Sequence, residues 1–221
     1  MTKWFASALT ALVLLSGPAH AQREEQEIVD RARITVSSML SSPDFREARN
    51  VMKRAKGVVV FPSLLKGGFI VGGEGGSGVL LVRGKDGSWS NPSFVTMGAG
   101  SIGLQIGVQS AEVLFMIMTD RGLQSVMQDE FKVGADASVA VGPVGAGVEA
   151  ATTANLRADI YSFSRTQGLF GGVSFEGSLL KPRPSWNESY YGRPVTPRQV
   201  VIDRTVSNPG ADQLRRALVV N

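Results

Sequence analysis

The acidic residues in the second half of the chain are the side chains whose type could support catalysis. Paired carboxylates carry out acid–base hydrolysis when they lie about 5 to 9.5 Å apart. The sequence does not show which acids meet, so a carboxylate-dependent hydrolase is one hypothesis among several. The candidates are Asp120, Asp129, Glu130, Asp136, Glu149, Asp159 and Glu176.

Other catalytic chemistry is restricted by two missing residue types. The chain has no cysteine, and its one histidine, His20, lies in a segment that we expect to be removed. A mature chain without Cys and His has no disulfide, no thiolate or imidazole metal ligand, no Cys–His nucleophile and no Ser-His-Asp triad. We therefore expect no metal, no cofactor and no catalytic residue, and we favour a binding protein over an enzyme.

Residues 1–21 have the features of a secretory signal peptide. Lys3 is followed by an apolar run at residues 8–15, and Ala19-His20-Ala21 has the small-x-small pattern of a cleavage site. The run is shorter than the ~20 apolar residues of a membrane-spanning helix. We expect cleavage after Ala21, export to the periplasm and peripheral membrane association. Cleavage removes one of 23 basic residues and none of the 19 acidic ones, which leaves a net charge of +3.

Two helices are expected between residues 23 and 56, separated by the break at residues 41–44. Both carry apolar residues at helical spacing: Ile28, Ala32, Val36, Met39 and Leu40 in the first, and Phe45, Ala48, Val51, Met52 and Ala55 in the second. At 100° per residue, four basic residues share an adjacent face of the second helix: Arg46, Arg49, Lys53 and Lys56. Such a face is either solvated or a contact for an anionic surface.

From Gly57 the hydrophobic period becomes strand-like. The stretch GGFIVGGEGGSGVLLVRG, residues 67–84, matches GxGxxG at 73–78, and a second match lies at 98–103. Strands follow both matches where a dinucleotide site needs a helix, so we do not expect nucleotide binding. Large β-formers on both sides argue against a flexible linker. Glycines inside strands indicate bulges, sharp curvature or close approach of another backbone, so the stretch is folded scaffold.

The remaining elements complete one domain. We expect a short β-rich run at residues 57–63, ended by Pro62, and further strands at 87–100, 101–109 and 111–118. A helix capped by Thr119 should extend to Gln128, and a second β-rich region should follow over 131–178. Short helices are expected near 186–191 and 211–219. The predicted division is a signal peptide (1–21), amphipathic helices (22–56), a β-rich core (57–200) that forms one domain with them, and a C-terminal tail (201–221).

Four blocks in this order resemble the SYLF family, which is also described as the yeast-type actin-binding domain and as a lipid-binding domain with phosphoinositide affinity. The blocks are AKGVVVFPSLLKGGFIVGGEGGSGVLLVR, SIGLQIGVQSAEVLFMIMT, VGADASVAVGPVGAGVEA and IYSFSRTQGLFGGVSFEGS. The resemblance covers about residues 25–200, and the expected signal peptide indicates a secreted, bacterial-type member.

The resemblance implies an α+β fold, with N-terminal helices before a strongly curved, mostly antiparallel, Gly-rich sheet and short C-terminal helices. It also implies a non-enzymatic module that binds anionic phospholipid through its amphipathic region and basic residues, here Arg46, Arg49, Lys53 and Lys56. For an exported chain we expect envelope lipids such as phosphatidylglycerol or cardiolipin, and neither nucleic acid nor actin, as partners. The alternative is a structural or interaction domain that pairs an exposed strand edge with an envelope protein.

Overall fold

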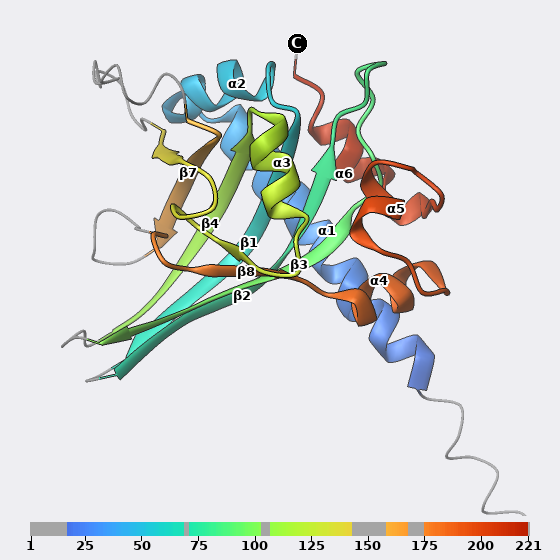
Figure 1. Ribbon diagram of the computed structural model, residues 1–221, viewed down its shortest axis with the longest axis horizontal. Helices are drawn as coiled ribbons and strands as arrows, with labels where there is room; N and C mark the ends of the chain where they lie inside the picture. The colour runs from blue at the N-terminus through green and yellow to red at the C-terminus, as the bar shows by residue number, and fades with distance from the viewer. Residues whose placement is uncertain (1–16, 69–70, 103–106, 143–157, 168–174, 221) are drawn as a thin grey trace, which may run out of the picture.

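The structure is a computed structural model that describes residues 17–68, 71–102, 107–142, 158–167 and 175–220 (Figure 1). The helices are α1 (Gly17–Ser41), η1 (Pro43–Phe45), α2 (Arg46–Met52), α3 (Asp120–Val126), α4 (Pro184–Tyr191), α5 (Pro197–Val201), η3 (Pro209–Ala211) and α6 (Asp212–Ala217). The strands are β1 (Gly57–Gly68), β2 (Val71–Val82), β3 (Ser93–Ile102), β4 (Gly107–Ile117), β5 (Phe131–Lys132), β6 (Val139–Val141), β7 (Ile160–Gln167) and β8 (Leu179–Pro182).

The strands form one curved sheet in the order β5-β8-β3-β2-β1-β4-β7-β6. All pairs are antiparallel except β6 with β7. Helix α1 crosses one face of the sheet, and α3 lies on the other (Figure 1). The short helices α4 and α6 pack against α1. The predicted α+β fold, with N-terminal helices, a curved and mostly antiparallel sheet and short C-terminal helices, is confirmed.

Both faces of the central strands are buried, which explains the unbroken apolar run at the start of β1. Side chains alternate between the two faces of a strand. Val58 and Val60 pack in a core with α1 and α2, while Val59 and Phe61 pack in a second core with α3 and β5. The sheet therefore separates two hydrophobic cores, one on each face.

Strand β1 does not end at Pro62, as the sequence predicted, but continues to Gly68. Its register shifts against β2 between Val60 and Leu65 and against β4 between Phe61 and Leu64, which marks a β-bulge around the proline. The bulge brings β1 close to β2. A Cβ atom on Gly76 would lie 2.3 Å from the carbonyl oxygen of Ser63. The glycines here permit close backbone approach, one of the three roles expected for them.

Other boundaries differ in part from the predictions. Thr119 caps α3 as expected, since its hydroxyl accepts a hydrogen bond from the Gly122 amide over 3.0 Å. Strand β3 begins at Ser93, because residues 87–92 form a connection, and α5 was not predicted. Much of the predicted β-rich region 131–178 lies outside the described residues, as do residues 103–106 of the predicted strand 101–109.

Helix α1 and the C-terminal helix α6 pack together on the same face of the sheet. Residues 1–16 of the expected signal peptide lie outside the described residues, while Gly17–Ala21 form the first turn of α1. In the predicted tail, Leu214 and Leu218 are buried in the core that contains α1. Among the described residues, no helix combines the length and apolar character needed to cross a membrane.

Candidate functional site

Arg49, one of the four predicted lipid-binding residues, has a structural contact. Its Nη1 atom donates to the carbonyl oxygens of Leu40 and Ser42, each over 2.8 Å. Leu40 belongs to the last turn of α1, whose carbonyl groups have no partner within the helix. Arg49 therefore closes the C-terminus of α1 and holds α2 against it.

The other three predicted residues lie near the same end of the sheet but not on one helix face. Arg46 is exposed on the first turn of α2, and Lys53 is exposed directly after its last residue. Lys56 lies beyond α2, and its Nζ is 2.7 Å from Asp120 Oδ2. Helix α2 is shorter than predicted and ends at Met52. The four cations therefore do not form one row: Arg46 and Lys53 are exposed, Lys56 is ion-paired and Arg49 is structural.

The connection between β2 and β3 brings further cations to this end. Arg83 donates from Nη1 to the carbonyl oxygen of Lys53 and from Nη2 to that of Met52, both over 2.7 Å. Its guanidinium also lies over the ring of Trp89, 4.7 Å from the ring centre. Arg83 thus fixes the connection to the end of α2, and the exposed Lys85 follows it by two residues in the same connection.

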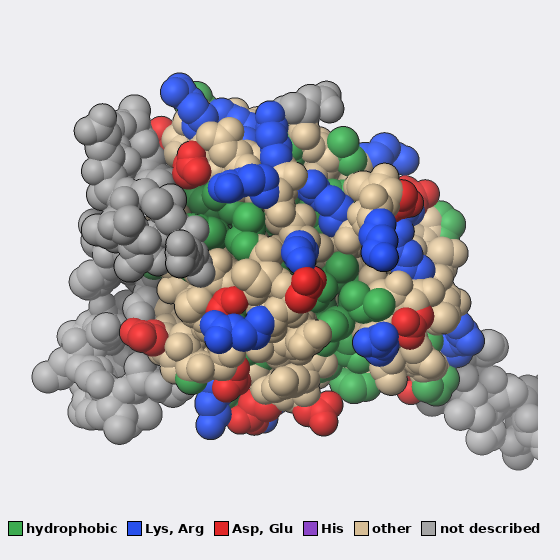
Figure 2. Space-filling view, turned by 45° about the horizontal axis from the view of Figure 1, so that its top comes forward, with side chains coloured by type: hydrophobic (Ala, Val, Ile, Leu, Met, Phe, Trp, Pro, Cys, Tyr) green, Lys and Arg blue, Asp and Glu red, His purple; other side chains and the backbone are tan. Residues whose placement is uncertain are grey.

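We call this region the basic end. It consists of Arg46, Lys53, Arg54, Lys56 and Lys85. Lys and Arg side chains gather over the upper part of the molecule in Figure 2, while acidic side chains are more frequent along its lower edge. The nearby acids Asp120 and Asp86 form ion pairs with Lys56 and Arg204. Within the described residues, Arg46, Lys53, Arg54 and Lys85 form no ion pair, so the basic end carries an excess of positive charge.

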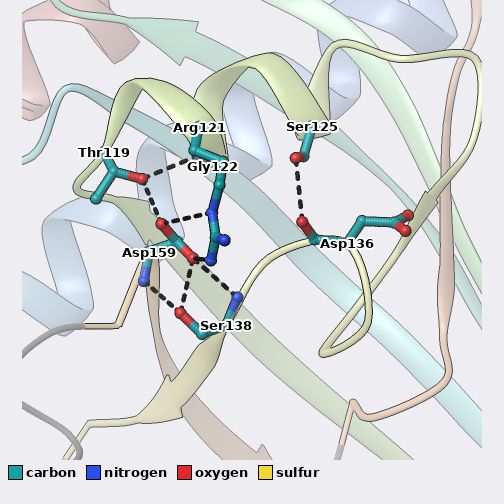
Figure 3. A network of polar contacts seen from close by, with 7 residues as sticks. All are labelled: Thr119, Arg121, Gly122, Ser125, Asp136, Ser138 and Asp159. Carbon is teal, nitrogen blue, oxygen red and sulfur yellow. Dashed lines mark hydrogen bonds and ion pairs between the residues drawn. The ribbon is translucent and has the colours of Figure 1, made fainter.

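Asp159, a candidate for acid–base chemistry, lies at the centre of a structural network (Figure 3). Its Oδ1 accepts from the Thr119 hydroxyl over 2.6 Å, and its Oδ2 accepts from the amide and hydroxyl of Ser138 over 3.0 and 2.7 Å. Arg121 forms an ion pair with the same carboxylate. These donors, Arg121 foremost, hold the pKa of Asp159 well below its usual value. The carboxylate joins the ends of β4, β6 and β7 and is not poised to exchange a proton near neutral pH.

The other candidate acids have separate local contacts. Asp120 pairs with Lys56, Glu130 with Lys181, and the carboxylate of Asp136 accepts from the Lys132 amide. No hydrogen bond among the described residues joins two of the candidate carboxyl groups, and Glu149 lies outside those residues. In the same part of the chain, no group of three or more His, Cys, Asp or Glu is placed to hold a metal ion. The arrangement gives no support to a hydrolase.

Glu112 is a partly buried acid, with 16% of its side chain exposed, that the sequence analysis missed. Its Oε1 accepts from the Thr35 hydroxyl over 2.7 Å, and its Oε2 accepts from Arg165 Nε over 2.7 Å. Arg165 also donates from Nη1 to the Ser38 hydroxyl over 2.8 Å. The network ties α1 to β4 and β7. A charged residue inside the apolar run at 111–118 was the available signal, since such a residue needs a buried partner.

The apolar face of α1 is occupied. Val29, Ala32, Val36 and Met39 are buried in the core between α1 and the sheet. Polar contacts add to this packing, because Gln26 donates to the carbonyl oxygen of Gly210 over 3.1 Å. The amphipathic pattern of this helix is therefore explained by packing onto its own domain, and the apolar side chains of this face do not face solvent.

Comparisons with known proteins identify relatives of this chain. The model of a family described as Ysc84, Las17-binding protein actin regulator, matches residues 98–220. Protein YSC84 of Saccharomyces cerevisiae is 36% identical over 171 residues, which cover 76% of this chain and 36% of that protein. SH3 domain-containing YSC84-like protein 1 of Homo sapiens is 30% identical over 179 residues, which cover 80% of this chain and 52% of that protein. The chain thus spans only part of these relatives. The sequence led us to expect that this chain does not bind actin. The family description, which names an actin regulator, gives that expectation no support.

Proposed function

This chain belongs to the Ysc84 family, and from that premise we propose that it is a binding module, not an enzyme, whose basic end contacts anionic phospholipid. The observation that carries this proposal is a set of exposed cations from two separate segments that form no ion pair with any residue the structure describes. Arg46, Lys53 and Arg54 come from α2 and the residues after it, and Lys85 comes from the connection between β2 and β3. Contacts of Arg83 hold the two segments together.

The expected binding is weak and electrostatic. A basic residue close to an anionic membrane contributes about 1 kcal/mol, so four such residues contribute about 4 kcal/mol. Exposed charges are screened by salt, since the Debye length is about 8 Å at physiological ionic strength. No insertion of α1 is part of this proposal, because its apolar face is buried in the core.

The cellular setting is part of the proposal. Export through the expected signal peptide would bring the chain to the periplasm, where phosphatidylglycerol or cardiolipin would supply the anionic surface. The positive net charge of the chain favours such a surface. Lys53 and Lys85 need no particular head group, since a lysine ammonium acts as a point charge.

Co-sedimentation with vesicles tests this function. Residues 22–221 are mixed with vesicles of phosphatidylcholine alone or of phosphatidylcholine with phosphatidylglycerol, at low and at physiological salt. We expect binding to the anionic vesicles only, weakened by salt. Equal binding to both vesicles, or none to either, contradicts the proposal.

A protein partner is the second candidate, and the family description favours it because it names Las17 binding and actin regulation. LAS seventeen-binding protein 3 of Saccharomyces cerevisiae is 36% identical to this chain, which covers 37% of that protein. Crosslinking followed by identification of the captured protein distinguishes this candidate. A specific partner that is bound regardless of lipid composition would favour it over the lipid-binding function.

A further inference from the structure

Arg204 has an unusual backbone conformation. Its φ is 53°, and within the described residues it is the one residue other than glycine with a positive φ. It lies two residues beyond Ile202, the C-cap of α5, and has a left-handed conformation that glycine adopts most readily. The conformation costs an L-residue about 1 kcal/mol. Such strain persists where the side chain has a specific task.

The side chain of Arg204 crosses to the connection between β2 and β3. Its Nη1 donates to the Ser88 hydroxyl over 2.7 Å, and its Nη2 donates to the Ser88 carbonyl oxygen over 2.9 Å. The same guanidinium lies 3.9 Å from Asp86 Oδ1. Both side chains lie over Gly84, because a Cβ atom there would be 2.5 Å from Asp86 Oδ1 and 2.6 Å from Arg204 Nη2. The guanidinium of Arg204 thus contacts both Ser88 and Asp86 of the connection.

Asp86 is the acid that this contact restrains. No other acidic residue occurs in the sequence between Glu74 and Glu112. The Asp86 carboxylate accepts from the amide and the hydroxyl of Ser88, over 3.1 and 2.8 Å from Oδ1. These hydrogen bonds, with a smaller effect of Arg204, lower the pKa of Asp86, so the group is charged at neutral pH. Unless it is balanced, its charge offsets that of the adjacent Lys85.

We propose that Arg204 is a positioning residue that balances the charge of Asp86, so that Lys85 supplies the net charge of this connection at the basic end. Three observations carry the inference: the left-handed backbone at Arg204, the hydrogen bonds from its guanidinium to Ser88, and the position of both side chains over Gly84. The charge balance itself does not depend on the proposed function. Only its expected effect, a stronger attraction of anionic lipid, rests on that function.

Two single variants and their combination test whether Arg204 balances the charge of Asp86. The variants are Arg204→Asn, since asparagine tolerates the left-handed region, Asp86→Asn, and the two together. In the wild-type background Asp86→Asn leaves the charge of Arg204 unbalanced, so we expect it to strengthen vesicle binding by about fivefold, the effect of one charge near an anionic membrane. Arg204→Asn should weaken binding by a similar factor, and Asp86→Asn in that background should restore the wild-type level.

A matched control separates charge balance from simple loss of a cation. Arg198→Asn removes the same charge from α5, where Arg198 pairs with Asp203 at 3.8 Å, and should weaken vesicle binding less than Arg204→Asn does. Thermal unfolding checks that each variant is folded. A structural role for Arg204 alone predicts that Asp86→Asn does not restore the binding lost in Arg204→Asn, which would overturn the inference.

The same set of variants on a sulfonated cation-exchange resin keeps this test separate from the proposed function. If the wild-type chain binds no anionic vesicle, the lipid proposal fails, yet the salt concentration at elution still measures the charge balance between Arg204 and Asp86. We expect Arg204→Asn to elute earlier and the double variant to elute with the wild type. Elution of the double variant with Arg204→Asn would overturn the inference even if vesicle binding were confirmed.

Discussion

The guanidinium of Arg49 lies 2.8 Å from the carbonyl oxygen of Leu40 and closes the last turn of α1. This contact separates Arg49 from Lys53, its neighbour in the predicted row of cations, which has no side-chain partner among the described residues. Charge reversal of both at once would therefore combine two effects. Loss of binding in that double variant would not distinguish a damaged fold from a lost contact with lipid.

Single substitutions separate these effects. Arg49→Gln should lower the free energy of unfolding by roughly 1 to 2 kcal/mol, because it removes two hydrogen bonds from a charged donor. Lys53→Gln should change it by less than about 0.5 kcal/mol, as is usual for exposed positions. Urea denaturation measures both. Equal stability of the two variants would show that the contacts of Arg49 contribute nothing.

The close approach of β1 and β2 predicts a difference between adjacent glycines. A Cβ atom on Gly76 would lie 2.3 Å from the Ser63 carbonyl oxygen, whereas one on Gly75 would lie 3.4 Å from the Met97 carbonyl oxygen. Gly76→Ala should therefore destabilise the fold by about 1 to 3 kcal/mol, the usual effect of overpacking. Gly75→Ala is the matched control. Similar melting temperatures for the two variants would argue against the bulge at Pro62.

Asp159 makes stability depend on pH. Asp159→Asn should lower the free energy of unfolding by about 2 kcal/mol at neutral pH, since it weakens hydrogen bonds to a buried charge. The folded-state pKa is lowered, so the contribution is complete above the unfolded pKa, near about 4. It is lost as the pH falls through the folded-state pKa. The difference between wild type and variant should therefore shrink below about pH 4.

Urea denaturation at several pH values measures this difference. Asp129→Asn is the control, because Asp129 is exposed, and it should leave stability nearly unchanged at every pH. A difference between wild type and Asp159→Asn that stays constant into acid would contradict the assigned role of the Asp159 charge.

The buried face of α1 predicts that this helix stays docked when lipid is present. The chain has no cysteine, so a single introduced thiol reports on its own site. Val36→Cys, at a buried position, should react with a maleimide at least ~100-fold more slowly than Ile34→Cys, which is 52% exposed on the same helix. Anionic vesicles should leave this ratio unchanged. Rapid labelling of Val36→Cys with vesicles would show that α1 is released onto the membrane.

Periodic features of the sequence predicted much of the fold. The apolar spacing at Val36 and Val51 correctly identified the buried faces of both N-terminal helices. The hydroxyl at Thr119 identified the start of α3. Such patterns work because helices and strands repeat their side-chain directions every 3.6 and two residues. The strand boundary at Pro62 was wrong, because a bulge accommodates a proline that a regular strand would exclude.

The site was less predictable, because its contacts join segments far apart in the chain. Arg49 and Lys53 have the same charge and neighbouring positions on a helix, yet only Arg49 reaches the end of α1. Lys85 joins the basic end through Arg83, which no spacing rule connects with α2. Arg204 contacts Ser88 from 116 residues away. Only the tertiary arrangement shows which charges are paired and which remain free.

The most direct test of the account reverses charge at the basic end without touching Arg49. Lys53→Glu with Lys85→Glu combines the two segments that meet there. Lys132→Glu on β5 is the control, because β5 pairs with β8 near Met97 and Gly98 of β3, about 20 Å along the strands from the end of β2. Co-sedimentation with phosphatidylglycerol vesicles should fall at least ~10-fold for the double variant and little for the control. Unchanged binding by a folded double variant would contradict the assignment of the basic end as the lipid-binding surface.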